Sequence, residues 1–205
     1  MKARYIIAAF AALVLSLGSA AAQEQFAIKT NLLHDATLSV DLGVEYGIAP
    51  HWSVELSGSV NQWQPGQLCL KHWLVAPEAR YWFCRRFSGT FVSLYAFGGQ
   101  ASLGGLYDFS QYYNKFPNLY NFMLKDALVL GGGVGIGHAF VLNRHWNVEV
   151  ELGLGYLYAK GDEYELLKDE NGKYYLPEGT IPVLEGSIFD YTGPTKLALS
   201  LVYLF

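Results

Sequence analysis

The chain contains 205 residues, of which 52% are hydrophobic and only 16% are charged. An ordinary soluble domain has roughly a quarter charged residues, and this composition argues against a disordered or coiled-coil protein. The 14 basic and 18 acidic residues give a formal net charge of −4, so there is no surplus of positive charge to neutralise phosphates, which argues against nucleic acid as a partner. The length allows one domain together with a processed segment.

The first 22 residues have the three marks of a secretory signal peptide. Lys2 and Arg4 make a positive start, residues 6–17 are apolar, and small residues lead to an A-x-A cleavage site. An N-terminal membrane anchor is the alternative, but the apolar run is shorter than the roughly 20 residues that a spanning helix needs. We therefore expect a signal peptide at 1–22 and a mature chain at 23–205.

Alternation of apolar and polar residues, which is typical of β-strands, dominates the mature chain. It is strict at residues 37–48 and recurs at residues 52–61, 146–158 and 196–205. Weaker candidates fill the gaps at residues 26–33, 71–83, 90–102 and 127–142. Several of these eight segments are 12 or 13 residues long, whereas strands in soluble proteins average about 5 or 6 and a tilted membrane-spanning strand needs about 9 to 11.

The breaks between these segments alternate in length. Short breaks fall at residues 49–51, 84–89 and 143–145, and longer ones at 64–70, 104–126 and 160–194. Short periplasmic turns and long outer loops are the pattern of outer-membrane barrels, and the brief turn at His34 to Ala36 is the exception. The sequence thus predicts an all-β protein, an eight-stranded antiparallel up-and-down transmembrane barrel, with long outer loops at about 104–126 and 160–194.

The two faces of the predicted strands differ in chemistry. Rows of large apolar residues suit lipid, and the opposite face carries carboxylates, which must then line the interior. Aromatic residues fall at both strand ends, as two interfacial girdles require. They are Trp52, Tyr81, Phe83 and Trp146 at the periplasmic ends and Trp63, Trp73, Tyr156 and Tyr158 at the outer ends. A soluble barrel of the lipocalin kind is the alternative, but it would turn its apolar face inward.

The predicted interior contains one guanidinium among five carboxylates. Arg80 shares its inward face with Glu78, near the depth of Glu45, Glu55, Glu149 and Glu151. We expect Arg80 to be the hub of a buried polar network that holds the barrel shut. A narrow gated pore is the alternative, although eight strands leave room only for side chains. The glycines of residues 131–137 match neither dinucleotide nor P-loop spacing, and small inward residues in a narrow barrel explain them.

The last strand ends in alternating Leu201, Tyr203 and Phe205. This ending resembles the C-terminal signal that is read by the outer-membrane insertion machinery. We expect the three residues to act as that insertion signal.

The predicted outer loops carry the most individual features. The segment 106–122 contains seven aromatic residues, namely Tyr107, Phe109, Tyr112, Tyr113, Phe116, Tyr120 and Phe122. Rigid amphipathic rings suit binding surfaces, so this loop is a candidate contact for an extracellular protein or glycan; a lid on the barrel mouth or packing at the lipid interface is the alternative. The acidic segment 160–194 contains Asn171-Gly172, which predicts a hairpin.

Catalytic and metal-binding signals are weak. His51 and Ser53 form an H-x-S pair that resembles outer-membrane lipid A deacylases, but barrel topology places His51 at a periplasmic turn, away from the outer leaflet. The five histidines lack metal-ligand spacing. Cys69 and Cys84 bracket one extended strand, which is too long for a disulfide. We expect no cofactor, no metal and no enzymatic activity.

Four strings carry a family resemblance: KTNLLHDA at 29–36, KHWLVAPEARYWFC at 71–84, the HW-N-VE strand at 145–149 and GPTKLALSLVYLF at 193–205. They resemble a Bacteroidota family of small outer-membrane barrels catalogued as a domain of unknown function. The resemblance implies the location and the fold but no activity, and some members are associated with surface fimbriae or adhesion systems. We expect a surface-exposed structural or interaction protein, with the lipid A deacylase as the second hypothesis.

Overall fold

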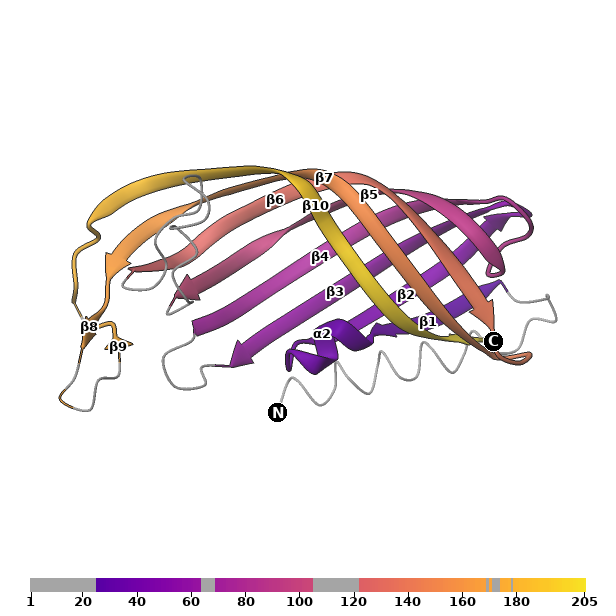
Figure 1. Cartoon of the computed structure of the whole chain (residues 1–205), viewed down its shortest axis with the longest axis horizontal. Helices are drawn as coiled ribbons and strands as arrows, with labels where there is room; N and C mark the ends of the chain where they lie inside the picture. The colour runs from indigo at the N-terminus through magenta and orange to yellow at the C-terminus, as the bar shows by residue number, and fades with distance from the viewer. Residues whose placement is uncertain (1–24, 64–68, 105–121, 169, 171–173, 178) are drawn as a thin grey trace, which may run out of the picture.

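A computed structural model describes residues 25–63, 69–104, 122–168, 170, 174–177 and 179–205 (Figure 1). The predicted signal peptide at 1–22 lies outside these residues. No helix in the described part is long and apolar enough to cross a membrane.

Eight strands of the described residues form one closed antiparallel ring. They are β1 (Phe26–Asn31), β2 (Val40–Ala49), β3 (Trp52–Trp63), β4 (Cys69–Trp82), β5 (Gly89–Gly104), β6 (Phe122–Val141), β7 (Trp146–Glu165) and β10 (Leu184–Leu204). Each strand pairs with the next along the chain, and β10 returns to pair with β1. The prediction of eight antiparallel strands in an all-β chain is confirmed.

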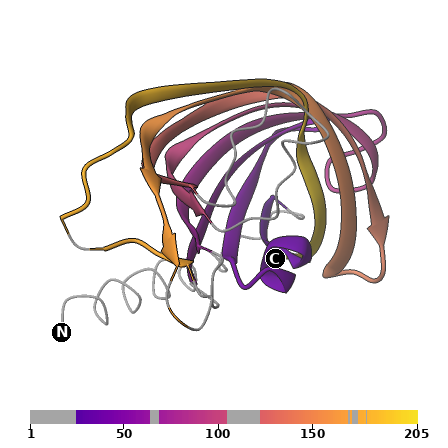
Figure 2. The ribbon, with the colours of Figure 1, turned by 60° about the vertical axis from the view of Figure 1, so that its left-hand side comes forward.

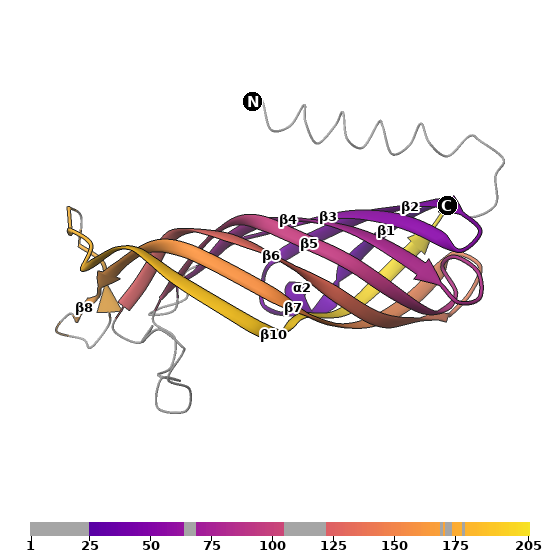
Figure 3. The same cartoon turned by 90° about the horizontal axis from the view of Figure 1, so that it is seen from above.

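The ring has one end with short turns and one with longer connections. The C-terminus and the short β2–β3, β4–β5 and β6–β7 turns lie at the first end, and β8 (Leu167–Lys168) and β9 (Tyr174–Tyr175) lie at the other (Figures 1 and 3). β8 and β9 pair with each other as the two arms of the predicted hairpin, and Asn171-Gly172 itself lies outside the described residues. Below, the two ends are called the short-turn end and the far end.

The connection between β1 and β2 differs from the prediction. A short helix, α2 (Leu32–Ala36), stands where a brief turn was expected, and Asn31 caps it by accepting a hydrogen bond from the Leu33 amide. Leu38 has a φ of 60°, so β2 begins only at Val40 and not at residue 37. Apolar–polar alternation does not detect such a break, because Leu38 still fits the pattern while its backbone leaves the strand.

Strands also extend into both predicted loop ranges. β5 runs to Gly104 and β6 begins at Phe122, where Phe122 pairs with Glu165 of β7. β7 continues to Glu165, and β10 begins at Leu184. Backbone pairing continues there although the side chains no longer alternate strictly, and alternation was the signal on which the boundaries 104–126 and 160–194 rested.

Side chains alternate between the interior and the exterior as predicted. Outward residues include Leu56, Leu94, Val134 and Leu154, each at least half exposed. Inward residues include Glu45 and Asn147, both fully buried. The ring is therefore apolar outside and polar inside over most of its length. Figure 2 shows how the strands curve around this interior.

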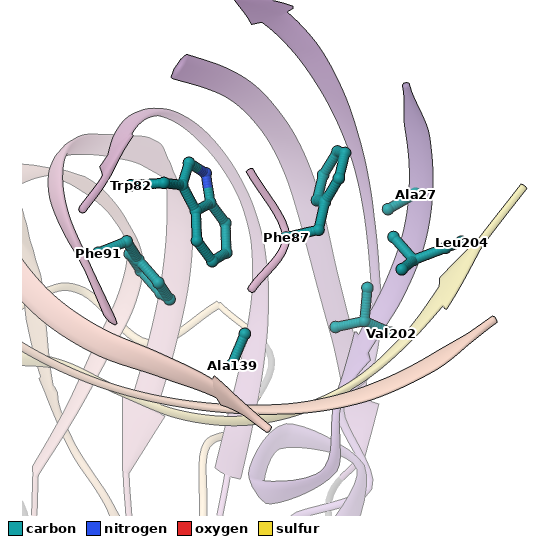
Figure 4. Close-up of a cluster of buried hydrophobic side chains, with 7 residues drawn as sticks. All are labelled: Ala27, Trp82, Phe87, Phe91, Ala139, Val202 and Leu204. Atoms are coloured by element: carbon teal, nitrogen blue, oxygen red, sulfur yellow. The ribbon is translucent and has the colours of Figure 1, made fainter. Parts of the chain in front are cut away.

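An aromatic plug fills the interior at the short-turn end (Figure 4). Trp82 lies between Phe87 and Phe91, with ring centroids 6.0 Å and 4.6 Å away. Phe87 comes from the β4–β5 turn with a φ of 62°, an unfavourable conformation for a bulky residue, and its carbonyl accepts a hydrogen bond from Asn147 at 2.7 Å. Burial of its ring offsets that backbone cost.

Replacement of Phe87 by Ala should destabilise the protein by about 3–5 kcal/mol, the usual cost of emptying a buried phenylalanine site. Urea unfolding of the purified protein, followed by tryptophan fluorescence, measures the loss. Phe83→Ala is the matched control, because Phe83 follows the same strand but is exposed. Equal losses for the two variants would contradict a packed plug.

Candidate functional site

A layer of buried charges lies beside the aromatic plug. Alternation along six strands turns these side chains inward, and the carboxylates and cations are at most 8% exposed apart from one partly exposed lysine. The carboxylates are Glu45, Glu55, Glu78, Glu149 and Glu151, and the cations are Lys29, Arg80 and Lys196. This set is called the charge layer below.

Arg80 of β4 is in contact with every carboxylate of the charge layer. Its Nε lies 2.5 Å from Glu78, Nη1 bridges two carboxylates, and Nη2 bridges two more. The four bridged residues are Glu45 and Glu149 on Nη1, at 3.0 and 2.8 Å, and Glu55 and Glu151 on Nη2, at 2.7 and 3.1 Å. The structure thus brings together all six residues that the sequence assigned to the interior network.

Two cations of the charge layer were missed in the sequence analysis. Lys29 of β1 lies 2.5 Å from Glu45, 3.0 Å from Glu55 and 2.9 Å from Glu149. Lys196 of β10 pairs with Glu78, and with Glu151 at 2.9 Å. The expectation that Arg80 is the only cation for five carboxylates is therefore corrected, because three cations share them.

Neutral groups complete the coordination of the charge layer. Ser53 donates to Glu45 at 2.5 Å, and Ser93 donates to Glu151 at 2.6 Å. The guanidinium carbon of Arg80 stands 4.5 Å from the centroid of the Phe91 ring, within reach of a cation–π attraction. In the described part of the chain, Oε1 of buried Glu149 has no hydrogen-bond partner, whereas its Oε2 contacts both Lys29 and Arg80.

The glycines of β6 make room for these groups. A Cβ atom on Gly135 would lie 2.4 Å from the Ser93 hydroxyl and 2.7 Å from a Glu151 carboxylate oxygen. One on Gly137 would lie 2.4 Å from the Phe91 ring. The glycine run therefore serves close packing of inward side chains, in agreement with the sequence interpretation.

A cavity of about 260 Å³ lies inside the ring on the far side of the charge layer. Lys29, Arg80 and Lys196 border its polar part, whereas Leu74, Phe97 and Leu157 border an apolar part. Such a mixed lining is typical of sites for small organic ligands. Among the described residues, no group of His, Cys, Asp and Glu side chains is arranged to hold a metal ion.

The other predicted site residues are placed unequally. Six aromatic residues of the candidate partner loop lie outside the described residues; they are Tyr107, Phe109, Tyr112, Tyr113, Phe116 and Tyr120. Phe122 is the first residue of β6. Leu201 and Tyr203 lie in β10 opposite β1, and Phe205 follows the strand, where its amide donates to the Phe26 carbonyl at 3.1 Å.

His51 and Ser53 do not contact each other as a catalytic pair would. His51 Nδ1 lies 2.9 Å from the Trp82 carbonyl. The Ser53 hydroxyl is buried, donates to Glu45 and accepts from the Trp82 indole at 2.8 Å. The side chains of His51 and Ser53 thus each connect the start of β3 to Trp82 of β4. Cys84 is an exposed free thiol beyond the end of β4, and Cys69 begins that strand.

Comparison with known proteins identifies the family. The model of a family described as a protein of unknown function, DUF3575, matches residues 7–205. The chain belongs to this family. The match spans nearly the whole sequence, including every strand of the ring. No curated protein matches the chain.

Replacement of Arg80 by Ala should cost about 3–5 kcal/mol of stability at neutral pH, because it leaves buried carboxylates without their shared cation. The loss should shrink in acid, where protonation of the carboxylates relieves their repulsion, and Glu78→Gln in the same chain should restore part of it. Thermal unfolding at several pH values measures both effects. Arg85→Ala is the control, since Arg85 is exposed in the adjacent turn; a similar melting temperature for both variants would refute the role of Arg80.

Proposed function

We propose that the protein is a non-enzymatic outer-membrane β-barrel that is exported through a cleaved signal peptide and acts at the cell surface as a structural or interaction protein. The observation that carries the proposal is the inverted polarity of the ring, with charges buried inside and large apolar side chains outside. The following features support each part of it.

The outward face supports a membrane location. Ten or more consecutive residues pair in β3, β4, β5, β6 and β7, which meets the roughly 9 to 11 that a bilayer crossing needs. The exposed apolar side chains occur on every strand from β2 to β7 and on β10. A water-soluble monomer rarely exposes a contiguous apolar patch above a few hundred Å², so water is a poor solvent for this surface.

Aromatic residues lie at both borders of the zone of outward-facing apolar side chains, and this arrangement also supports a membrane location. At the short-turn end Trp52 packs edge-on against Tyr81 at 5.1 Å, and Trp146 against Tyr203 at 5.0 Å. Towards the far end, exposed Trp73 donates its indole hydrogen to Gln100 at 3.1 Å. Amphipathic rings with a polar atom favour the two membrane interfaces.

The filled interior supports the hypothesis of a closed barrel and argues against a pore. The aromatic plug and the charge layer follow each other along the axis, and ion pairs connect strands on opposite sides of the ring. Eight strands enclose an interior that side chains can fill. We therefore favour a membrane scaffold over the gated pore.

The far end supports a role at the surface. β6, β7 and β10 have 20, 20 and 21 residues, about twice the length of a bilayer-crossing strand. Their extensions and the β8–β9 hairpin would stand above the outer leaflet. An extracellular protein or glycan is the partner that we propose for this part, and a link to fimbriae or adhesion agrees with the resemblance of the sequence.

Cell fractionation should recover the protein in the outer membrane, and the folded protein should migrate differently in detergent gels before and after boiling. Closed barrels often resist detergent at room temperature because no strand edge is available for unfolding. Recovery in the soluble periplasmic fraction, with identical migration of boiled and unboiled samples, would overturn the membrane location.

Replacement of Phe205 by Asp should deplete the protein from the outer membrane and leave export intact. Phe205 packs against Phe26 at 5.4 Å and against Tyr203 at 5.0 Å, where β10 meets β1 and the ring closes. Pulse labelling with fractionation measures export and insertion separately. Phe83→Asp, an exposed aromatic at the same end, is the control; normal insertion of Phe205→Asp would contradict the insertion signal.

A further inference from the structure

Two strand pairs of the ring carry the same arrangement of side chains at the short-turn end. The first pair is β3 with β4 and the second is β7 with β10, which lie four strands further around the ring. A His-Trp dipeptide opens the first strand of each pair, at residues 51–52 and 145–146, and a Tyr-x-Phe tripeptide closes the second, at residues 81–83 and 203–205. In both pairs the tryptophan lies opposite the tyrosine. The two tripeptides are called the β4 end and the β10 end below.

The contacts of the two histidines match. The His51 carbonyl accepts a hydrogen bond from the Trp82 amide at 2.8 Å, and the His145 carbonyl accepts one from the Leu204 amide at 2.8 Å. Nδ1 of His51 lies 2.9 Å from the Trp82 carbonyl, and Nδ1 of His145 lies 3.0 Å from the Leu204 carbonyl. In both pairs, the histidine thus holds the middle residue of the tripeptide.

The aromatic packing matches as well. Trp52 stands edge-on to Tyr81 at 5.1 Å, and Trp146 stands edge-on to Tyr203 at 5.0 Å. Within both the β4 end and the β10 end, the tyrosine ring meets the phenylalanine ring at an interplanar angle of 87°. Both phenylalanines are exposed. The two ends therefore present the same outward surface of alternate aromatic rings.

The match continues into the charge layer. Glu55 and Glu149 each lie four residues after their histidine, and each contacts both Lys29 and Arg80 at 2.7–3.0 Å. The ring thus repeats one arrangement after four strands, in sequence spacing, register, hydrogen bonds and packing.

The general preference of aromatic side chains for a membrane interface does not account for this repeat. β2 and β6 also end at the short-turn end, at Ala49 and Val141, and neither closes with a Tyr-x-Phe tripeptide. A preference for the interface acts equally on all four strands that end there. The repeat is therefore a property of the two specific strand ends.

We propose that the β4 end is a second, internal surface for the machinery that inserts the barrel. A partner that recognises Tyr203 and Phe205 on an extended strand meets the same two side chains, with the same spacing and the same neighbours, at Tyr81 and Phe83. This inference rests on the proposed insertion signal at the β10 end, and it adds a site that the sequence analysis did not assign.

The β4 end is the weaker of the two surfaces. The chain continues from it into β5, which pairs with β4 and competes with the partner for that strand. Ala79 also takes the place of Leu201 two residues before the tyrosine, which leaves less apolar area for contact. A change of Phe83 alone therefore leaves insertion through the β10 end intact.

The test is a circular permutant in which the β4 end becomes the end of the chain. The Phe205 amide donates to the Phe26 carbonyl at 3.1 Å, so a short glycine–serine linker can join these two residues. The permutant keeps residues 1–25, continues with residues 84–205 and the linker, and finishes with residues 26–83. It should be recovered in the outer membrane, because its last strand carries the β4 end.

The matched control permutant is opened in the β6–β7 turn, at the same end of the ring. It keeps residues 1–25, continues with residues 143–205 and the linker, and finishes with residues 26–142, so its last strand lacks the tripeptide. It should be exported and remain outside the membrane. Equal insertion of the two permutants, or failure of the first to insert although it refolds in detergent, would overturn the proposal.

A double variant tests the internal surface in the natural chain order, whether or not the permutants fold. Phe205→Asp alone should leave a residual fraction inserted through the β4 end, and Phe83→Asp in the same chain should remove that fraction. Phe140→Asp combined with Phe205→Asp is the control, since Phe140 is an exposed aromatic of β6 at the same end, and it should leave the residual fraction unchanged. Equal insertion of Phe205→Asp and the double variant, including none in either, would contradict the second surface. Recovery of the unaltered protein outside the outer membrane would instead refute the proposed location, so the two failures are distinguishable.

Discussion

The ring depends on how the charges that face inward are paired. Arg80 contacts carboxylates from β2, β3 and β7 as well as its own strand, Lys29 links β1 to β7, and Lys196 links β10 to β4. These contacts cross the interior, whereas backbone hydrogen bonds join only neighbouring strands. Buried ion pairs add little stability compared with a well-packed apolar core, but loss of one partner is expensive. The network therefore favours one arrangement of strands over slipped alternatives.

Register follows from the same pairing. Glu45 of β2 lies opposite Glu55 of β3, and Glu55 lies opposite Glu78 of β4. Like charges directly opposite one another destabilise a sheet, so this alignment requires the cations that these carboxylates share. A slip of one residue would turn the carboxylates outward and the apolar row inward. The charge layer and the apolar exterior thus specify the same register.

The sequence was sufficient for those parts of the fold in which apolar residues occupy one face of a strand and polar residues occupy the other. Between Trp146 and Tyr156, apolar residues alternate with Asn, Glu and Gly, and the structure has a strand with those two faces. Arg80 and its five carboxylates could be assigned to the interior by parity alone. Beyond the rows of outward apolar residues this rule fails, because polar residues such as Asp162 and Glu163 follow one another in β7 without alternation. The ends of the strands could therefore not be predicted.

The missed cations show a second limit. Lys196 has the parity of Ala198 and Ser200, which was visible in the sequence, but pairing it with Glu78 requires knowledge that β10 and β4 face each other across the ring. Lys29 lies in a strand of 6 residues, too short for alternation to carry weight. The signal that could have identified both is charge balance, because five inward carboxylates require more than one cation.

The cations of the charge layer lie between the filled part of the interior and the cavity. Lys196 follows the register shift beside Pro194, and its side chain is the most exposed of the three cations, at 23%. A bulge bends a strand and redirects its side chains, so this irregularity directs a cation towards Glu78 and Glu151. Towards the short-turn end the layer rests on Trp82 and Phe91, and towards the far end it forms the floor of the cavity. One set of ion pairs therefore both closes the interior beside the aromatic plug and supplies the charged wall of the cavity, where Lys29, Arg80 and Lys196 all belong to the lining.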